Sequence, residues 1–307
     1  MNRLAYISHP DTLLHIMDGQ HPESPARITA INHALNASPL KQQLTFYTAP
    51  LATPAQLKRV HDAQYVDMIY RIAPKAGLVR LDADTAMGPA SLEATLRASG
   101  AALLATDLVM QQQVQRAFCC IRPPGHHAGK ANSAGFCIFN HVAVGVAHAM
   151  AKYGVKKVAI IDFDVHHGDG TEDIFKDNPN VMLCSTFQHP FYPYKGADTS
   201  SAHIRNFPLA AGSNGEVVKQ VFTQQIGPAV AQFKPELLFI SAGFDAHEAD
   251  PLANLQLTTF DYRWMTEFIT DLAVKFCKGR VVSCLEGGYD LRYLPQCTMA
   301  HLLALTH

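Results

Sequence analysis

The sequence predicts an α/β protein built as one domain on a central, mostly parallel sheet. Short apolar runs rich in β-branched residues end in Gly, Asp or Pro, and they alternate with longer segments of helical period. This alternation is typical of parallel strands joined by crossover helices. The 307 residues contain no internal repeat, low-complexity segment or linker-like stretch, and sheets of this kind commonly reach that length as one unit. We therefore expect one domain over residues 1–307.

Four of the apolar runs matter most for function, because a polar cluster follows each of them. The predicted strands cover residues 117–121, 157–163, 236–241 and 280–285. The predicted helices cover residues 91–113, 140–153, 216–233 and 259–278. Ligand sites of open α/β sheets form at the carboxyl ends of the strands, where the loops converge over the sheet edge. The four clusters are thus expected to share one crevice.

The composition is that of a globular protein with a large core. Apolar residues make up 48% of the chain and the formal net charge is −1, so nucleic acid is not an expected partner. The N-terminus lacks the apolar region of a signal peptide, and no stretch reaches the roughly 18 apolar residues of a membrane span. We therefore expect a cytoplasmic protein with no membrane contact. The seven cysteines form no CxxC pair, which predicts buried, reduced thiols.

The strongest local motif is DFDVHHGDG at residues 162–170. In extended backbone Asp162, Asp164 and His166 project to one side, while the apolar residues between them face the other. Zinc accepts oxygen and nitrogen donors, and a catalytic site usually takes three protein ligands. Asp245, in the loop after another predicted strand, is the expected third ligand. A helix cap or loop hydrogen bond explains a single Asp here, but three like-facing polar residues at a buried strand end are costly without a compensating charge.

The second cluster is RPPGHHAG at residues 122–129. Two prolines followed by glycine fix an irregular loop, in which His126 and His127 can present their imidazoles close together. Histidine suits proton transfer near neutral pH, although a lone histidine here is more often structural. Asp162 and Asp169 are available to hold the far ring nitrogens, as in a base and orienter pair.

The last cluster is EGGYD at residues 286–290. Its glycines permit backbone turns closed to other residues, and Tyr289 can direct its hydroxyl towards a developing oxyanion. The motif alone is weak evidence. Its weight comes from following a fourth strand beside a predicted metal and two histidines.

Taken together, RPPGHHA, GFCIFNHVA, IDFDVHHGDGTEDIF, SAGFDAH and EGGYD resemble the histone deacetylase family, in particular its class II and bacterial deacetylase-like branch. HPESPAR at residues 21–27 is similar to the first loop of that family, so the resemblance spans nearly the whole chain. It implies a three-layer α/β/α arginase/deacetylase-like fold. It also implies a zinc-dependent amidohydrolase that removes acetyl or other acyl groups from lysine-like amines.

The resemblance assigns roles to the motif residues. One zinc per chain would be bound by Asp164, His166 and Asp245. His127 would be the general base and acid, with His126 as its electrostatic partner. Tyr289 would polarise the amide carbonyl opposite the metal. Metal-activated water would then attack the amide, and zinc and Tyr289 would hold the oxyanion.

Substrate contacts also follow from matching positions. Gly135 and Phe136 would line a narrow tunnel for the acyl-lysine stem together with Tyr192, for which core packing is the alternative. Asp84 would clamp the substrate backbone, or else cap a helix. Polyamine-selective relatives have a glutamate where this chain has Leu252, which favours acyl-lysine over acetylpolyamine.

Family members also bind monovalent cations, so the resemblance implies a structural potassium ion. The matching positions are Asp162, Asp164, His166 and Ser185 for an inner site, and Phe175 and Val181 for an outer one. Arg27 matches a position near the channel through which acetate leaves, with a surface salt bridge as the alternative. His141 stands where the family commonly has a second Asn, which puts the local loop packing in doubt.

Other functions remain to be weighed against this one. An arginase-like or agmatinase-like ureohydrolase needs a two-metal site, and its second set of aspartates is missing here. A catalytically silent acyl-group binder would not need Tyr289 or the histidine pair. The expected partners are acylated lysine side chains of proteins, with acetylpolyamines or other small acylated amines as the alternative, and an oligomer is possible.

Overall fold

The computed structural model describes residues 4–199 and 201–307 and contains an eight-stranded sheet in the order β2-β1-β5-β10-β9-β6-β7-β8. Every pairing within this sheet is parallel. The strands are β1 (Leu4–Ser8), β2 (Leu44–Thr48), β5 (Arg116–Cys119), β6 (Val158–Asp162), β7 (Val181–Gln188), β8 (Ile204–Leu209), β9 (Leu237–Ala242) and β10 (Val281–Leu285). A separate antiparallel hairpin joins β3 (Val79–Arg80) to β4 (Ala86–Met87).

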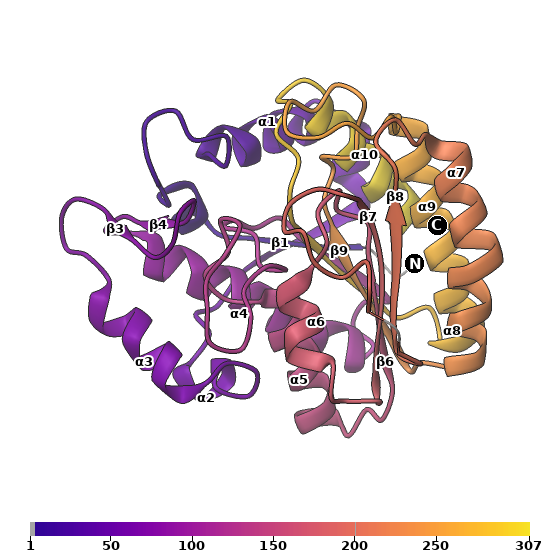
Figure 1. The fold of residues 1–307 in the computed structure, drawn as a ribbon, viewed down its shortest axis with the longest axis horizontal. Helices are drawn as coiled ribbons and strands as arrows, with labels where there is room; N and C mark the ends of the chain where they lie inside the picture. The colour runs from indigo at the N-terminus through magenta and orange to yellow at the C-terminus, as the bar shows by residue number, and fades with distance from the viewer. Residues whose placement is uncertain (1–3, 200) are drawn as a thin grey trace.

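Helices cover both faces of the sheet, so the predicted three-layer α/β/α architecture is confirmed (Figure 1). One layer comprises α1 (Pro25–Asn36), α7 (Gly215–Val221), α8 (Gly227–Phe233), α9 (Thr259–Phe276) and α10 (Tyr293–Leu305). The other comprises α4 (Ser91–Met110), α5 (His141–Tyr153) and α6 (Asp169–Phe175), with α2 (Pro54–Leu57) and α3 (Ala63–Ile72) outside it. Short 3-10 turns occupy Pro10–Leu13 and Pro39–Gln43.

Alternation along the strands divides the core into two halves. In β6, Ala159 and Ile161 join the apolar cluster under α1, α9 and α10, whereas Val158 and Ile160 join the cluster under α4 and α5. A strand buried on both faces reads as a continuous apolar run, which is why the sequence pattern located it. The seven cysteines are buried free thiols, as expected.

The element boundaries differ from the predicted ones for local reasons. The Asn140 side chain accepts a hydrogen bond from the Ala143 N–H, so Asn140 caps α5 and the helix begins at the next residue. The segment predicted as one helix over residues 216–233 is divided into α7 and α8 by a π-helical turn at Phe222–Ile226. Among the described helices, none is long and apolar enough to cross a membrane.

His141 is accommodated without strain. It is the first residue of α5 and fully buried, and its ring nitrogens lie 2.8 Å from Ser99 Oγ and 3.0 Å from the Pro123 carbonyl oxygen. The histidine therefore anchors the loop before His126 to α4, and the doubt about local packing is removed.

Candidate active site

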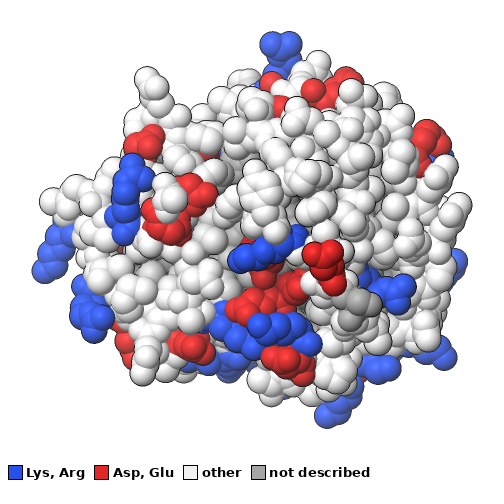
Figure 2. All heavy atoms as spheres, viewed as in Figure 1, with Lys and Arg blue, Asp and Glu red and all other residues white. Residues whose placement is uncertain are grey.

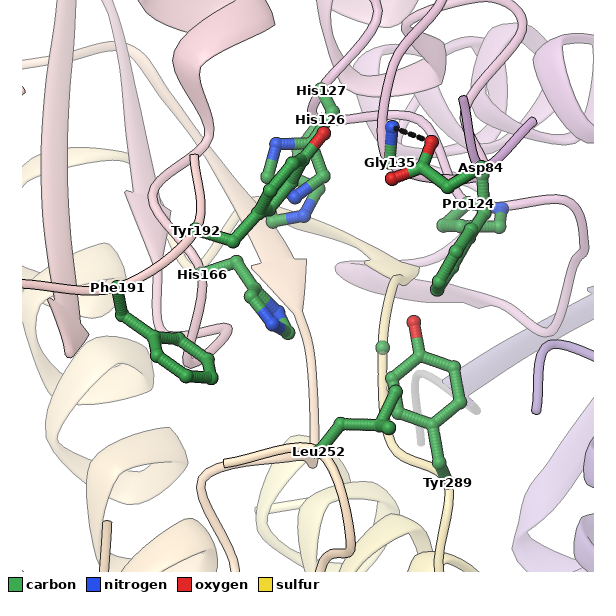
Figure 3. A pocket seen from close by; sticks show the side chains of 12 residues that line it. Asp84, Pro124, His126, His127, Gly135, His166, Phe191, Tyr192, Leu252 and Tyr289 are labelled. Atoms are coloured by element: carbon green, nitrogen blue, oxygen red, sulfur yellow. Dashed lines mark hydrogen bonds between the residues drawn. The ribbon is translucent and has the colours of Figure 1, made fainter. Parts of the chain in front are cut away.

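The carboxyl ends of β5, β6, β7, β9 and β10 surround a pocket of about 210 Å³ (Figure 3). The predicted residues that line it are Asp84, His126, His127, Gly135, Phe136, His166, Tyr192, Leu252 and Tyr289. Pro124, Phe191 and Gly287 line it as well, and sequence reasoning did not identify them. The four predicted clusters therefore do share one crevice, with a fifth loop from β7.

The deepest part of the site holds a cluster of possible metal ligands. One ligand atom each of Asp164, His166 and Asp245 lies within 4.8 Å of the other two. His166 Nδ1 lies 3.1 Å from Asp164 Oδ1 and 3.3 Å from Asp245 Oδ2. Asp245 Oδ2 is buried and accepts no hydrogen bond of proper geometry. A buried carboxylate oxygen without a donor, beside a second carboxylate and an imidazole, fits a site shaped for a cation.

The surrounding backbone fits closely round these carboxylates. A Cβ at Gly243 would collide with the Asp164 carboxylate, and a Cβ at Gly287 would collide with that of Asp245. The Gly287 N–H donates to Asp164 Oδ2 at 2.9 Å, which fixes the Asp164 carboxylate in place. Two carboxylates and one imidazole supply the oxygen and nitrogen donors that zinc accepts, so the residues present fit this metal.

The field at this cluster also favours a positive charge. Burial opposes protonation of His166, but the carboxylates of Asp164 and Asp245 outweigh it and raise the pKa of His166 to about 10. A cation bound between these side chains would be stabilised by the same two carboxylates.

The extended geometry predicted for this motif is wrong. Strand β6 ends at Asp162, and the following residues form bends in which carboxylates accept loop N–H groups. Asp162 Oδ1 accepts from the Asp164 N–H at 3.1 Å, and Asp164 Oδ1 accepts from the His166 N–H at 2.9 Å. The loop hydrogen bonds expected of an ordinary Asp are thus present, and they turn Asp164 and His166 towards Asp245.

The two histidines of the RPPGHHAG loop each pair with a separate carboxylate. His126 Nδ1 lies 2.9 Å from Asp162 Oδ2, and His127 Nδ1 lies 2.8 Å from Asp169 Oδ1. The ring centroids are 4.1 Å apart. Since each Nδ1 is engaged, Nε2 is the nitrogen that each ring has free for other partners.

The neighbouring charges differentiate these histidines. Burial lowers the pKa of His126, but Asp164 and Asp162 outweigh burial and hold it well above the ordinary value. Burial and the adjacent His126 lower the pKa of His127 to about 4. The pKa of His127 is thus the lower of the two, and its ring is the neutral imidazole that can accept a proton near neutral pH.

Two buried carboxyl groups for which no role was predicted support the site from behind. Glu286 Oε2 accepts from the Gly125 N–H at 2.6 Å and the His126 N–H at 3.2 Å, and burial raises the pKa of Glu286 to about 7. Asp250 Oδ2 accepts from the Tyr289 N–H at 2.7 Å, and burial raises its pKa to about 7. The signal that could have identified them is an acidic residue in the loop after a buried strand: Glu286 follows the apolar run 280–285, and Asp250 lies in the loop after the run 236–241.

Tyr289 lies across the pocket from His166 and directs its hydroxyl into the cavity (Figure 3). Its ring meets Phe136 edge to face at 6.0 Å, and the Arg27 guanidinium lies 4.9 Å from its centroid. Arg27 is fully buried and donates to the Gly288 carbonyl oxygen at 2.6 Å and to Glu23 at 3.3 Å. The alternative of a surface salt bridge for Arg27 is therefore wrong.

The pocket walls are aromatic and apolar. Tyr192 meets His127 edge to face at 5.1 Å, and Phe191 stacks on His166 at 5.5 Å. Tyr192 is only partly buried and lines the cavity, so the core-packing alternative is wrong. Phe191 lies in the loop after β7, which was not among the four predicted strands. Inspecting the loop after this strand as well would have identified Phe191.

Asp84 lies in the turn between β3 and β4 and faces the pocket (Figure 3). Asp84 Oδ1 accepts from the Gly135 N–H at 3.2 Å. The helix-cap alternative is wrong, because α4 begins only at Ser91 and Asp82 accepts the turn N–H groups instead.

The potassium positions remain a prediction. Asp162 and Ser185 are register partners on β6 and β7, while Phe175 ends α6 and Val181 begins β7. Across residues 4–199 and 201–307, the triad of Asp164, His166 and Asp245 is the only cluster of three such side chains that could hold a metal. The described residues contain no second such cluster, which the two-metal site of a ureohydrolase would need.

Comparisons with known proteins agree with one another. A family model described as "Histone deacetylase domain" matches residues 21–305. An uncharacterized protein of Synechocystis is 36% identical over 98% of this chain and 99% of its own length. The "Histone deacetylase-like amidohydrolase" of Pseudomonas aeruginosa is 36% identical over 91% of this chain and 75% of its own. The crystal structure of the HDA15 HD domain superposes with a TM-score of 0.91 at 32% identity, covering 99% of this chain and 88% of that one.

Proposed function

This chain belongs to the histone deacetylase family, and on that premise we propose that it is a zinc-dependent amidohydrolase that removes acetyl or other acyl groups from lysine-like amines. The family makes it a hydrolase of the deacetylase class. Zinc, the roles of individual residues and the identity of the amine are our proposal. It is carried by one observation: His166 of a triad that could hold a metal, His127 held by a carboxylate, and Tyr289 all line one pocket.

Asp164, His166 and Asp245 would hold the zinc, which when bound polarises an amide carbonyl and makes a water molecule more acidic. The proton of the attacking water goes to His127 Nε2, since Nδ1 of that ring is occupied by Asp169. The same nitrogen then returns the proton to the departing amine. Asp169 fixes the tautomer that this transfer needs.

The developing oxyanion is stabilised by groups already in place. Tyr289 donates its hydroxyl hydrogen to the oxyanion. The Tyr289 backbone is fixed because its N–H donates to the Asp250 carboxylate. His126 lies beside His127, and Asp162 holds its Nδ1 at 2.9 Å, so its ring stays in place next to the reacting groups. These groups are preorganised because their partners are buried and hydrogen-bonded.

The walls of the pocket favour an unbranched acyl-lysine stem. Phe136 and Tyr192 present ring surfaces to its methylene groups, and Leu252 offers no charge for a second amine. Asp84 lies at the pocket with a carboxylate that can accept an N–H of the substrate backbone. We therefore propose acylated lysine side chains of proteins as the substrate class.

Two further parts of the proposal concern the setting of the enzyme. We propose a structural potassium ion near Asp162 and Ser185, which are register partners on neighbouring strands. The fully buried carboxylate of Asp162 supports this proposal. We also propose a cytoplasmic location, which the seven unpaired cysteines support.

A turnover panel on zinc-loaded protein tests the proposal. Acetyl-lysine peptides, longer acyl-lysine peptides and acetylpolyamines are compared by released carboxylate, with a hydroxamate chelator and Asp245→Asn as controls. We expect acyl-lysine peptides to be hydrolysed, and both controls to abolish turnover. Hydrolysis of acetylpolyamines alone would overturn the substrate assignment but leave the chemistry. If no member is hydrolysed and the chelator changes nothing, the hydrolase assignment to this site is wrong.

A further inference from the structure

A second, polar cavity of about 280 Å³ lies behind the candidate active site. Asp169, Lys176 and Lys195 line it, and so does His127, which lines the substrate pocket as well. Figure 2 shows acidic atoms recessed between basic ones on this face of the molecule, close to α6. His127 thus borders both cavities, and of the two only the second is lined by lysine side chains.

Asp169 connects the histidine to this second cavity. Asp169 Oδ1 lies 2.8 Å from His127 Nδ1, while Asp169 Oδ2 accepts from Lys195 Nζ at 2.8 Å. The Asp169 side chain is 9% exposed, and that of Lys195 is 67% exposed. The Asp169 carboxylate therefore contacts the His127 ring through its inner oxygen, Oδ1, and the exposed Lys195 ammonium through its outer oxygen, Oδ2.

The other acidic groups of the cavity are engaged elsewhere. Glu172 accepts from Asn206 and Thr199 and pairs with His167, and Asp173 pairs with Lys176 at 2.9 Å. Of the Lys and Arg residues that the structure describes, Lys195 is the one within ion-pair distance of Asp169.

We propose that Lys195 is a positioning residue for His127. The terminal torsion of an aspartate is broad, so a carboxylate held by one oxygen can rotate or turn to water. Lys195 fixes the outer oxygen of Asp169, which keeps the inner oxygen on Nδ1 of His127 and its Nε2 directed to the substrate pocket. Lys195 does not line that pocket, so its effect falls on the chemical step rather than on substrate binding.

The kinetic test rests on the proposed function and uses zinc-loaded protein with an acyl-lysine peptide. Lys195→Met removes the ammonium and keeps the length of the side chain. Because the Lys195 ammonium is exposed, we expect a moderate effect: kcat falls roughly two- to fivefold and KM is unchanged. The fall in kcat is smaller at high salt, where the ion pair is screened. Lys195→Arg restores kcat. Lys176→Met, in the same cavity but paired with Asp173, is the matched control and leaves both constants unchanged.

A spectroscopic test does not depend on turnover. The ¹⁵N signals of the His127 ring, assigned by their loss in His127→Gln, report the hydrogen bond at Nδ1. Lys195→Met is expected to shift them, whereas Lys176→Met is not. Unchanged His127 signals, or a Lys195→Met protein whose KM changes while kcat does not, would overturn the proposal. If wild-type protein hydrolyses no substrate, the proposed function fails, and the ring signals still decide the role of Lys195.

Discussion

Tyr289→Phe removes one hydroxyl from the candidate active site and leaves the rest of the side chain in place. The Tyr289 ring keeps Phe136 at 6.0 Å and the Arg27 guanidinium at 4.9 Å, and its backbone N–H still donates to Asp250. No described side chain accepts from the hydroxyl, so folding stability should change by less than about 1 kcal/mol. Loss of one oxyanion donor costs about a hundred- to a thousandfold in kcat, or about 3–4 kcal/mol.

The assay is steady-state deacylation of an acyl-lysine peptide beside urea unfolding of the same preparations. Tyr262→Phe is the matched control, because the Tyr262 hydroxyl is buried without a hydrogen-bond partner and lies outside the pocket. Its removal should leave kcat unchanged and stability equal or higher. A Tyr289→Phe enzyme that keeps wild-type kcat would refute the oxyanion role. Loss of turnover with retained hydroxamate binding supports it.

Three other changes test separate parts of the account. Gly287→Ala places a methyl group against the Asp245 carboxylate, so zinc affinity measured against a competing chelator should fall about 10- to 100-fold. Leu252→Glu puts a carboxylate at the pocket wall, and kcat/KM for an acetylpolyamine relative to acetyl-lysine should rise roughly tenfold. Burial alone would raise the pKa of Glu23, but Arg122 and other cations outweigh burial and lower this pKa from 4.5 to about 2. The ionised Glu23 therefore stabilises the fold fully above pH 4.5, and this contribution is lost as the pH falls towards 2. Glu23→Gln should flatten this part of the stability curve from urea unfolding and cost about 3–5 kcal/mol at pH 7.

Unchanged zinc affinity in Gly287→Ala would mean that the metal does not lie against Asp245. An unaltered substrate ratio in Leu252→Glu would remove Leu252 from substrate selection. A Glu23→Gln protein with the wild-type loss of stability below pH 4.5 would place the acid-sensitive group elsewhere.

The sequence predicted the residues of the site better than their geometry. Strand ends could be found because strands buried on both faces are continuous apolar runs, and polar side chains beyond them had to converge. The path of the chain after Asp162 could not be found by strand alternation, because the carboxylates of Asp162 and Asp164 bond to loop N–H groups and bend the backbone.

Long-range partners were hidden for a different reason. Arg27 reads as a surface residue because the carbonyl oxygens that accept from its guanidinium, those of Glu286 and Gly288, lie 259 and 261 residues further along the chain. Its buried partner Glu23 in turn pairs with Arg122, which is 99 residues away. Glu286 and Asp250 act on backbone N–H groups, which any residue type can supply, so no side-chain motif marks their partners.

A metal titration tests the central claim most directly. Chelator-treated protein is titrated with zinc while bound metal and carboxylate release from an acyl-lysine peptide are measured in the same samples, beside Asp245→Asn. We expect binding and activity to rise together and to end at one zinc per chain, and Asp245→Asn to lose both. Full activity in metal-free protein, or wild-type zinc binding by Asp245→Asn, would contradict it.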